Sequence, residues 1–256
     1  MSTPGFGLAE SYDERQPVVL LLDTSASMAR PAESPRIEEL DAALRRLFDG
    51  VRGKLRLRAR MEICLITFDS RVRVLDPTRG ALVPVEEAPA DRLFVPVDEL
   101  SPPHLTASGV TRLTEAVETA LGLARHRYRT LQAQRVQVRR PFLWVLTDGA
   151  PSDAHGRRAD PAAVAATARK VRSGEERGEC VLLAVGVRGA DLELLGMLAP
   201  NAALRLEGLD FEQILGSMFQ SSDVIGAFGA VDDIHVQVSA EMKRQERIRL
   251  LEEKHR

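Results

Sequence analysis

The sequence predicts an α/β fold with a doubly wound, mostly parallel sheet and helices on both faces. The first observation behind this prediction is that short apolar runs alternate with stretches of helical spacing along most of the 256 residues. The second is that runs such as FLWVLT and CVLLAVGV are almost continuously apolar, which is typical of strands covered by helices on both faces. The chain is also long enough to bury the core of one such domain.

Six apolar runs are predicted as strands, namely Val18–Asp23, Met61–Phe68, Arg71–Leu75, Phe142–Thr147, Cys180–Val187 and Ala203–Leu206. Between them, IEELDAALRRLF places Ile37, Leu40 and Leu44 three or four residues apart, which gives one apolar stripe on a helix. Four more segments with this spacing are LTEAVETALGLA, PAAVAATARKV, ADLELLGMLA and DFEQILGSMF. The last of them opens on Asp210, a residue type that suits a helix N-cap.

The domain organisation follows from the parts that break this alternation. Residues 1–16 are expected to form a flexible lead, 17–222 the α/β domain and 223–256 a C-terminal appendage. Residues 76–108 are rich in proline and carry only weak strand signals, so they are expected to form an insertion or extended loop. In the appendage, Ile234, Val236 and Val238 alternate with polar residues and predict a short strand-like stretch before a charged tail, read as a solvated or partner-binding helix.

Composition narrows the cellular setting and the partner classes. The formal net charge is −2 and aromatic residues make up 4%, so neither a nucleic-acid partner nor a membrane surface is expected. The N-terminus lacks the pattern of a secretory signal, and no apolar run is long enough to span a bilayer. Cys64 and Cys180 lie inside apolar runs and are expected to be buried, reduced thiols. A cytoplasmic location follows.

Oxygen-bearing side chains cluster where the predicted strands end. Asp23, Ser25 and Ser27 follow the first strand, and alternate side chains of an extended chain point the same way. Thr111 stands where a loop enters a helix, and Asp148 follows the strand FLWVLT. In open α/β sheets the carboxyl ends of strands form the binding crevice. One or two carboxylates with several hydroxyls suit a divalent cation, most naturally Mg²⁺, although Mn²⁺ or Ca²⁺ would also fit.

Each fragment taken alone has an ordinary structural explanation. Asp followed by Ser after a strand is common N-cap chemistry, and T-D-G often forms a turn. Asp69 and Asp153 are read as surface or loop-capping residues rather than as ligands. The metal site is therefore predicted from the three fragments together.

The combined motifs resemble the metal-ion-dependent adhesion site of von Willebrand factor A domains. The resemblance lies in D-x-S-x-S after a strand, a threonine in an S-G-x-T-x-L setting, and T-D-G after a central strand. PVVLLLDTSASM, ICLITFDSRV, LTASGVTRL and WVLTDGAPSD look most like bacterial, intracellular members linked to tellurium resistance and chemical stress, the TerY-like type. The resemblance covers residues 17–222 and departs from the family pattern at Ala26 and Val110, where relatives often carry glycine.

This resemblance implies a metal-dependent protein-interaction module and not an enzyme. The metal-site residues would be Asp23, Ser25, Ser27, Thr111 and Asp148, with the two aspartates binding directly or through water. A Glu or Asp of a partner protein would complete the coordination. The family implies a PP2C-type phosphatase or a protein kinase as partners in a stress-response system, or alternatively an adaptor role for an AAA+ ATPase machine.

Two other function classes agree less well with the sequence. A metal-dependent hydrolase or phosphatase with an Asp-led loop commonly needs a second carboxylate two residues later, where this chain has Ser25. His104 and His155 lie in polar loop segments and are read as solvated, so no general base is evident. Basic stretches at 52–60 and 125–140 would suit nucleic acid, but acidic residues flank both stretches and aromatic residues are nearly absent.

Overall fold

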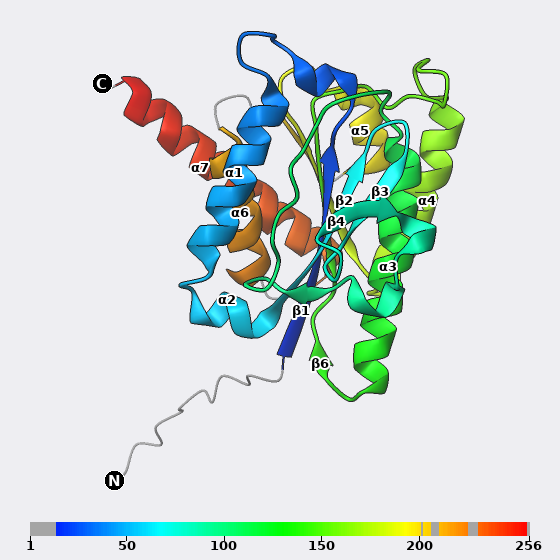
Figure 1. Cartoon of the computed structure of the whole chain (residues 1–256), viewed down its shortest axis with the longest axis vertical. Helices are drawn as coiled ribbons and strands as arrows, with labels where there is room; N and C mark the ends of the chain where they lie inside the picture. The colour runs from blue at the N-terminus through cyan, green and yellow to red at the C-terminus, as the bar shows by residue number, and fades with distance from the viewer. Residues whose placement is uncertain (1–13, 201, 206–209, 225–229, 255–256) are drawn as a thin grey trace.

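The computed structural model describes residues 14–200, 202–205, 210–224 and 230–254, and its centre is one mixed sheet with helices on both faces (Figure 1). The described strands are β1 (Glu14–Asp23), β2 (Met61–Phe68), β3 (Val72–Asp76), β4 (Ala81–Pro84), β5 (Val95–Pro96), β6 (Gln137–Val138), β7 (Phe142–Thr147), β8 (Val181–Gly186) and β9 (Ala203–Arg205). This architecture confirms the predicted fold class.

The order of the strands identifies where a ligand would bind. The sheet runs β4-β3-β2-β1-β7-β8-β9, with β5 beside β2 and β6 beside β1. β1 is parallel to β2 and to β7, the pairs β7–β8 and β8–β9 are also parallel, and β3 and β4 are antiparallel. The chain adds strands on one side of β1 and then returns to add β7 on the other side. The strand order therefore reverses at β1 and β7, and open α/β sheets bind ligands at the carboxyl ends of such strands.

Helices form a layer on each face of this sheet. On one face lie α1 (Arg36–Val51), α6 (Phe211–Val224) and α7 (Val231–Lys254), and on the other α3 (Leu113–Ala133) and α4 (Pro161–Glu176) (Figure 1). α5 (Leu192–Leu198) packs against α4 and β9, and α2 (Leu55–Arg60) leads into β2. Short 3₁₀ helices are η1 (Ala26–Ala29), η2 (Val85–Glu87) and η3 (Ala90–Arg92).

The central strands are buried on both faces, as their continuous apolar sequences predict. Every side chain of β2, β7 and β8 is buried. Trp144 on β7 is fully buried, and its indole nitrogen donates a hydrogen bond of 3.0 Å to the hydroxyl of Ser222 on α6. This bond satisfies the one polar atom of the indole and fixes α6 against the sheet.

Most strand predictions hold with small shifts at their ends. Met61–Phe68 and Phe142–Thr147 match the observed strands residue for residue. The predicted lead, 1–16, is wrong for residues 14–16, which belong to β1; residues 1–13 lie outside the described residues. Residues 76–108 are largely irregular but contribute β4 and β5 to the sheet.

The appendage differs from its predicted conformation. The stretch with Ile234, Val236 and Val238 was predicted to be strand-like, but it lies within the helix α7. Ile234 and Val238 are 2% and 0% exposed, whereas Val236 is 67% exposed. Residues four apart share one face of a helix and residues two apart do not, so the buried pair follows the helical period. The charged tail continues this helix to Lys254.

The state of the two cysteines and the length of the apolar helices were also predicted from the sequence. Cys64 and Cys180 are free and buried, as predicted, and burial raises the pKa of the Cys180 thiol to about 12. A protonated thiol in such a position packs as a small apolar side chain. Among the described residues, no helix has the length and apolar character needed to cross a membrane.

Candidate metal centre

The structure brings together the side chains that the sequence singled out. Asp23 is the last residue of β1, and Asp148 follows directly after β7, its parallel neighbour. Ser25 and Ser27 lie at the start of η1, and Thr111 lies just before α3. Asp23, Ser25 and Asp148 are 0%, 1% and 2% exposed. Ser27 is only half-buried, so the group opens to solvent on its side.

Short contacts connect four of the five residues. The Ser25 and Ser27 hydroxyl oxygens are 3.0 Å apart, and the Ser27 hydroxyl donates to Oδ1 of Asp148 at 2.6 Å. Oδ1 of Asp23 accepts from the backbone N–H of Ser25 at 2.8 Å, and Oδ2 accepts from the hydroxyl of Thr147. The Ser27 hydroxyl thus lies within hydrogen-bond distance of groups from two different loops.

Gly149 leaves space at the point where the loops meet. A Cβ atom on this residue would lie 3.0 Å from Oγ1 of Thr111, 3.2 Å from Oγ of Ser27 and 3.5 Å from Oδ2 of Asp23. Oxygen atoms of two loops therefore surround one point beside the third loop, which the glycine keeps free. This is the arrangement that a cation coordinated by several side-chain oxygens requires.

Backbone hydrogen bonds hold the three loops in register. The N–H of Ala26 donates to the carbonyl of Gly109 at 3.1 Å, and the N–H of Ser108 donates to the carbonyl of Thr24 at 2.8 Å. Thr111 is fixed to the third loop from both sides. Its N–H donates to the hydroxyl of Ser152, and its carbonyl accepts from the N–H of Ser152, both at 2.8 Å.

The departures from the family pattern leave the backbone unstrained. Among the described non-glycine residues, only Arg135 has a positive φ, so Ala26 and Val110 need no conformation that would favour glycine. Gly109 does need one, with φ of 70°, and a Cβ there would approach the hydroxyl oxygen of Ser70 to 2.2 Å. The glycine that the loop requires is therefore present.

The two carboxylates of this group have different surroundings. Burial raises the pKa of Asp23 to about 6, with a smaller contribution from the nearby negative charge of Asp148. The described hydrogen bonds to Asp23 come from uncharged donors. Asp148 instead forms an ion pair through Oδ2 with the Arg36 guanidinium at the start of α1.

The donor set fits a hard divalent cation. Two carboxylates and three hydroxyls supply oxygen ligands only, which Mg²⁺ and Ca²⁺ prefer and which the softer metals do not. In the described part of the chain, His, Cys, Asp and Glu side chains form no group of three able to hold a metal. A metal at this position would therefore depend on the hydroxyl groups of Ser25, Ser27 and Thr111.

The histidines considered as catalytic bases contact other groups. The His104 imidazole lies 3.2 Å from the Asp41 carboxylate and is largely exposed, and His155 is exposed. Asp153 accepts backbone N–H bonds from His155 and Arg157, as expected of a loop-capping residue. Asp69 is also capping, accepting from the N–H of Arg71, but it is buried rather than on the surface.

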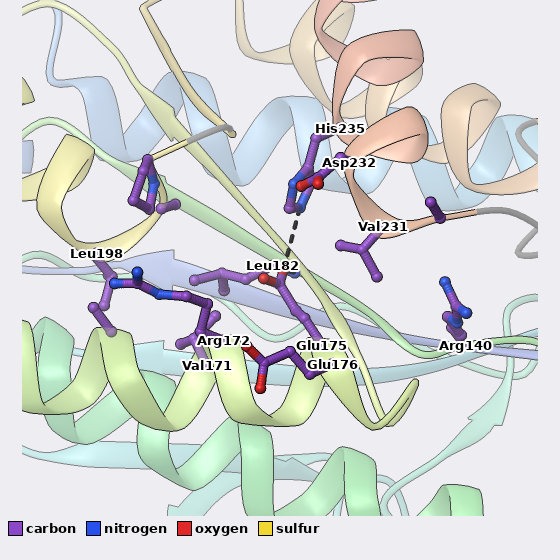
Figure 2. A pocket seen from close by; sticks show the side chains of 14 residues that line it. Arg140, Val171, Arg172, Glu175, Glu176, Leu182, Leu198, Val231, Asp232 and His235 are labelled. Atoms are coloured by element: carbon purple, nitrogen blue, oxygen red, sulfur yellow. Dashed lines mark hydrogen bonds and ion pairs between the residues drawn. The ribbon is translucent and has the colours of Figure 1, made fainter.

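A cavity of about 610 Å³ lies at the opposite edge of the sheet, between α4, the start of β8 and α7 (Figure 2). The buried imidazole of His235 on α7 faces Glu175 of α4 there, with 3.2 Å between Nε2 and Oε1. Oε1 of Glu175 also accepts from the backbone N–H of Leu182 on β8 at 2.9 Å. These contacts link the appendage to α4 and β8. They lie apart from the oxygen cluster, the name used below for Asp23, Ser25, Ser27, Thr111 and Asp148.

Three residues that contact or border the oxygen cluster were not predicted from the sequence to have a role in the site. Thr147 holds Asp23, Gly149 keeps the central space free, and Arg36 pairs with Asp148. Thr147 and Gly149 flank Asp148 in T-D-G, so that motif carried a signal for both. Arg36 lies in a segment without any motif, and only the folded chain brings it to Asp148.

No protein-family model and no curated protein sequence matches the chain. Several solved structures are similar to it. A von Willebrand factor type A protein from Catenulispora acidiphila aligns over 82% of this chain and 43% of its own, with 18% identity and a TM-score of 0.52. The ArnB paralog VWA2 from Sulfolobus acidocaldarius aligns over 81% and 45%, with 13% identity and a TM-score of 0.48.

A third similar structure is proximal thread matrix protein 1 from the mussel byssus, solved with a zinc-occupied MIDAS motif. It aligns over 82% of this chain and 48% of its own, with 15% identity and a TM-score of 0.45. The chain spans less than half the length of each of these three structures. The Catenulispora match has the highest TM-score of the three, and the observed sheet is mostly parallel with helices on both faces. This chain therefore has the fold of a von Willebrand factor type A domain.

Proposed function

We propose that the chain is a non-enzymatic interaction module that binds a protein partner through a divalent cation, preferably Mg²⁺, held by Asp23, Ser25, Ser27, Thr111 and Asp148. The observation that carries this proposal is the space beside Gly149, where oxygens of Asp23, Ser27 and Thr111, from two loops, lie within 3.5 Å of one point next to the third loop. A bound cation would supply a Lewis acid at the rim of the sheet. The three hydroxyls are neutral ligands, so a dication held by at most two carboxylates retains affinity for a further acidic ligand.

The partner chemistry follows from the opening of the site. Ser27 is half-buried while Asp23 and Asp148 are buried, so a ligand reaches the cluster from the Ser27 side. A Glu or Asp side chain of a partner protein has the charge and the oxygen ligands for that position. The finer proposal is a bacterial, cytoplasmic stress-response or tellurium-resistance system with a PP2C-type phosphatase or protein kinase as partner. An adaptor role for an AAA+ ATPase machine is the alternative.

A hydrolase is the less favoured function because of what surrounds Asp23. The position two residues later is Ser25, whose hydroxyl contacts Ser27 rather than a base. None of the described hydrogen bonds connects a histidine to Asp23, Ser25 or Asp148. Nucleophilic catalysis by serine needs such a base within hydrogen-bond reach.

A nucleic-acid role is disfavoured by the pairing of the basic stretches. Arg58 contacts Asp98 at 2.6 Å, Arg127 contacts Glu62 at 2.7 Å, and Arg125 and Arg129 both contact Glu179 at 2.9 Å. Arginines that neutralise carboxylates of the same chain contribute little net positive potential toward phosphate.

Calorimetric titration with Mg²⁺ tests the metal site. We expect saturable binding by the wild type and no binding by Asp23→Ala. Equal heats for the two proteins would contradict the proposal. A pull-down with and without EDTA then tests the interaction, because a partner held through the metal should be lost on chelation. A partner retained in EDTA and by Asp23→Ala would show that binding uses another surface.

A further inference from the structure

Arg36 is the cation that the fold itself supplies to the oxygen cluster. It is the first residue of α1, and its Nη1 donates to Oδ2 of Asp148. The Asp148 side chain is 0% exposed and that of Arg36 is 23% exposed, so the contact is largely shielded from solvent. Oδ1 of Asp148 accepts from Ser27, and both carboxylate oxygens are therefore engaged.

The charges at this position explain why such a contact forms. Asp23 and Asp148 follow adjacent parallel strands, and both are buried. Two buried negative charges repel each other and lose hydration, which makes the metal-free site unfavourable without a positive charge. In the described contacts of Asp23 and Asp148, the Arg36 guanidinium is the charged donor, and the other donors are hydroxyl and backbone N–H groups.

The positive charge of Arg36 also opposes the binding of a divalent cation next to Asp148. A dication held by Ser27, Thr111 and Asp23 would lie beside Asp148, one of whose oxygens already pairs with Arg36. Positive charges that share one carboxylate in a low-dielectric site repel each other. Arg36 reaches the site at the end of a long side chain with partial exposure, so it has room to move toward solvent.

We propose that Arg36 is a built-in counter-cation that competes with the metal: it neutralises Asp148 in the metal-free protein, and a divalent cation binds with loss of the Arg36–Asp148 ion pair. This inference rests on the proposed metal site and adds a regulatory element to it. Arg36 then lowers the affinity for the metal while it stabilises the metal-free fold. Once released, the guanidinium lies at the rim where the partner's acidic residue is expected.

The test measures metal affinity in variants of Arg36 by calorimetric titration with Mg²⁺, and with Mn²⁺ as a spectroscopic probe. Arg36→Gln removes the charge, Arg36→Lys keeps it, and Arg45→Gln removes a charge from the exposed Asp41 pair on the same helix. We expect Arg36→Gln to bind Mg²⁺ at least about tenfold more tightly than the wild type. The expected size follows from proton binding, because a neighbouring opposite charge changes the affinity of a carboxylate for a proton by about ten- to a thousandfold. Arg36→Lys and Arg45→Gln should stay near the wild type.

A second measurement makes the result independent of metal binding. In EDTA, Arg36→Gln should melt at a lower temperature than the wild type, since Asp148 loses its counter-charge, and Mg²⁺ should restore most of the loss. Unchanged or weaker metal binding by Arg36→Gln would overturn the inference, as would an equal gain in Arg36→Lys. Absence of binding by the wild type and by every Arg36 variant would instead refute the metal site itself, so the two failures are distinguishable.

Discussion

Gly149 is the residue on which the space inside the oxygen cluster depends. Its φ lies outside the left-handed region, so alanine can adopt the same backbone. The added Cβ would contact Thr111 Oγ1 at 3.0 Å and Ser27 Oγ at 3.2 Å, which is tight but requires only a small shift. We therefore expect Gly149→Ala to fold normally and to bind Mg²⁺ about 10–100-fold more weakly, a range typical of changes that displace metal ligands indirectly.

The matched control is Gly122→Ala on α3, because no atom beyond the adjoining backbone of the helix lies within 4 Å of the Cβ position there. Calorimetric titration should show wild-type affinity for this variant, and circular dichroism should show the native fold for both. Wild-type affinity in Gly149→Ala would mean that the cation, if it binds, does not occupy the space beside this glycine.

Individual site residues differed in how far the sequence could identify them. Asp23 and Asp148 follow apolar strands, and the carboxyl ends of parallel strands meet, so their proximity follows from the fold class. Thr111 lies outside regular structure, and its place was indicated only by motif context. Arg36 could not be predicted, because its contact depends on the path of residues 30–35, for which no period or motif specifies a conformation.

At the scale of secondary-structure elements, α7 shows how one pattern can fit two periods. Ile234, Val236 and Val238 alternate as in a strand, but the first and last are also four residues apart, as on a helix face. Met242 extends the helical series and is 0% exposed. The longer segment thus favours a helix, whereas a window of five residues does not distinguish the two.

If this segment is helical, charged substitutions at two valines of α7 should change the free energy of unfolding by very different amounts. Val238→Asp places a charge in the core and should lower the free energy of unfolding by about 3 kcal/mol or more. Val236→Asp, on the exposed face, should change it by less than about 0.5 kcal/mol. Urea denaturation followed by circular dichroism measures both. Equal destabilisation by the two variants would support the strand-like alternation and contradict the packing of α7.

At the scale of the whole molecule, Asp23 differs from the buried carboxylates that pair with arginines, which include Asp148 at the same ends of the strands. At the amino ends of the strands, three glutamates are buried and paired with arginines of the basic stretch 125–140. They are Glu14, Glu62 and Glu179. At the carboxyl ends, Asp23 has only neutral hydrogen-bond donors among its described contacts and a raised pKa. Paired carboxylates connect elements, whereas a buried carboxylate without a counter-charge leaves the molecule able to gain stability from a cation.

Glu179 provides a pH test of the paired edge. Burial opposes ionisation of this carboxyl, but hydrogen bonds from Arg177 and Arg129 hold its pKa below the ordinary value of 4.5. A lowered pKa in the folded state means that the stabilisation is complete above the unfolded pKa and is lost as pH falls through the folded value. We expect Glu179→Gln to lower the free energy of unfolding at pH 7 by about 1 kcal/mol, since its arginine partners are partly exposed.

The size of this deficit should depend on pH, and that dependence distinguishes an ionic role from a packing role. Urea denaturation at pH 7 and again below pH 4 should show the difference between Glu179→Gln and the wild type shrinking as the wild-type carboxyl becomes protonated. Glu176→Gln, on the exposed end of α4, should show no deficit at either pH. A Glu179→Gln deficit of the same size at both pH values would mean that Glu179 acts through shape and neutral hydrogen bonds, and that the arginines at this edge do not stabilise the fold through its charge.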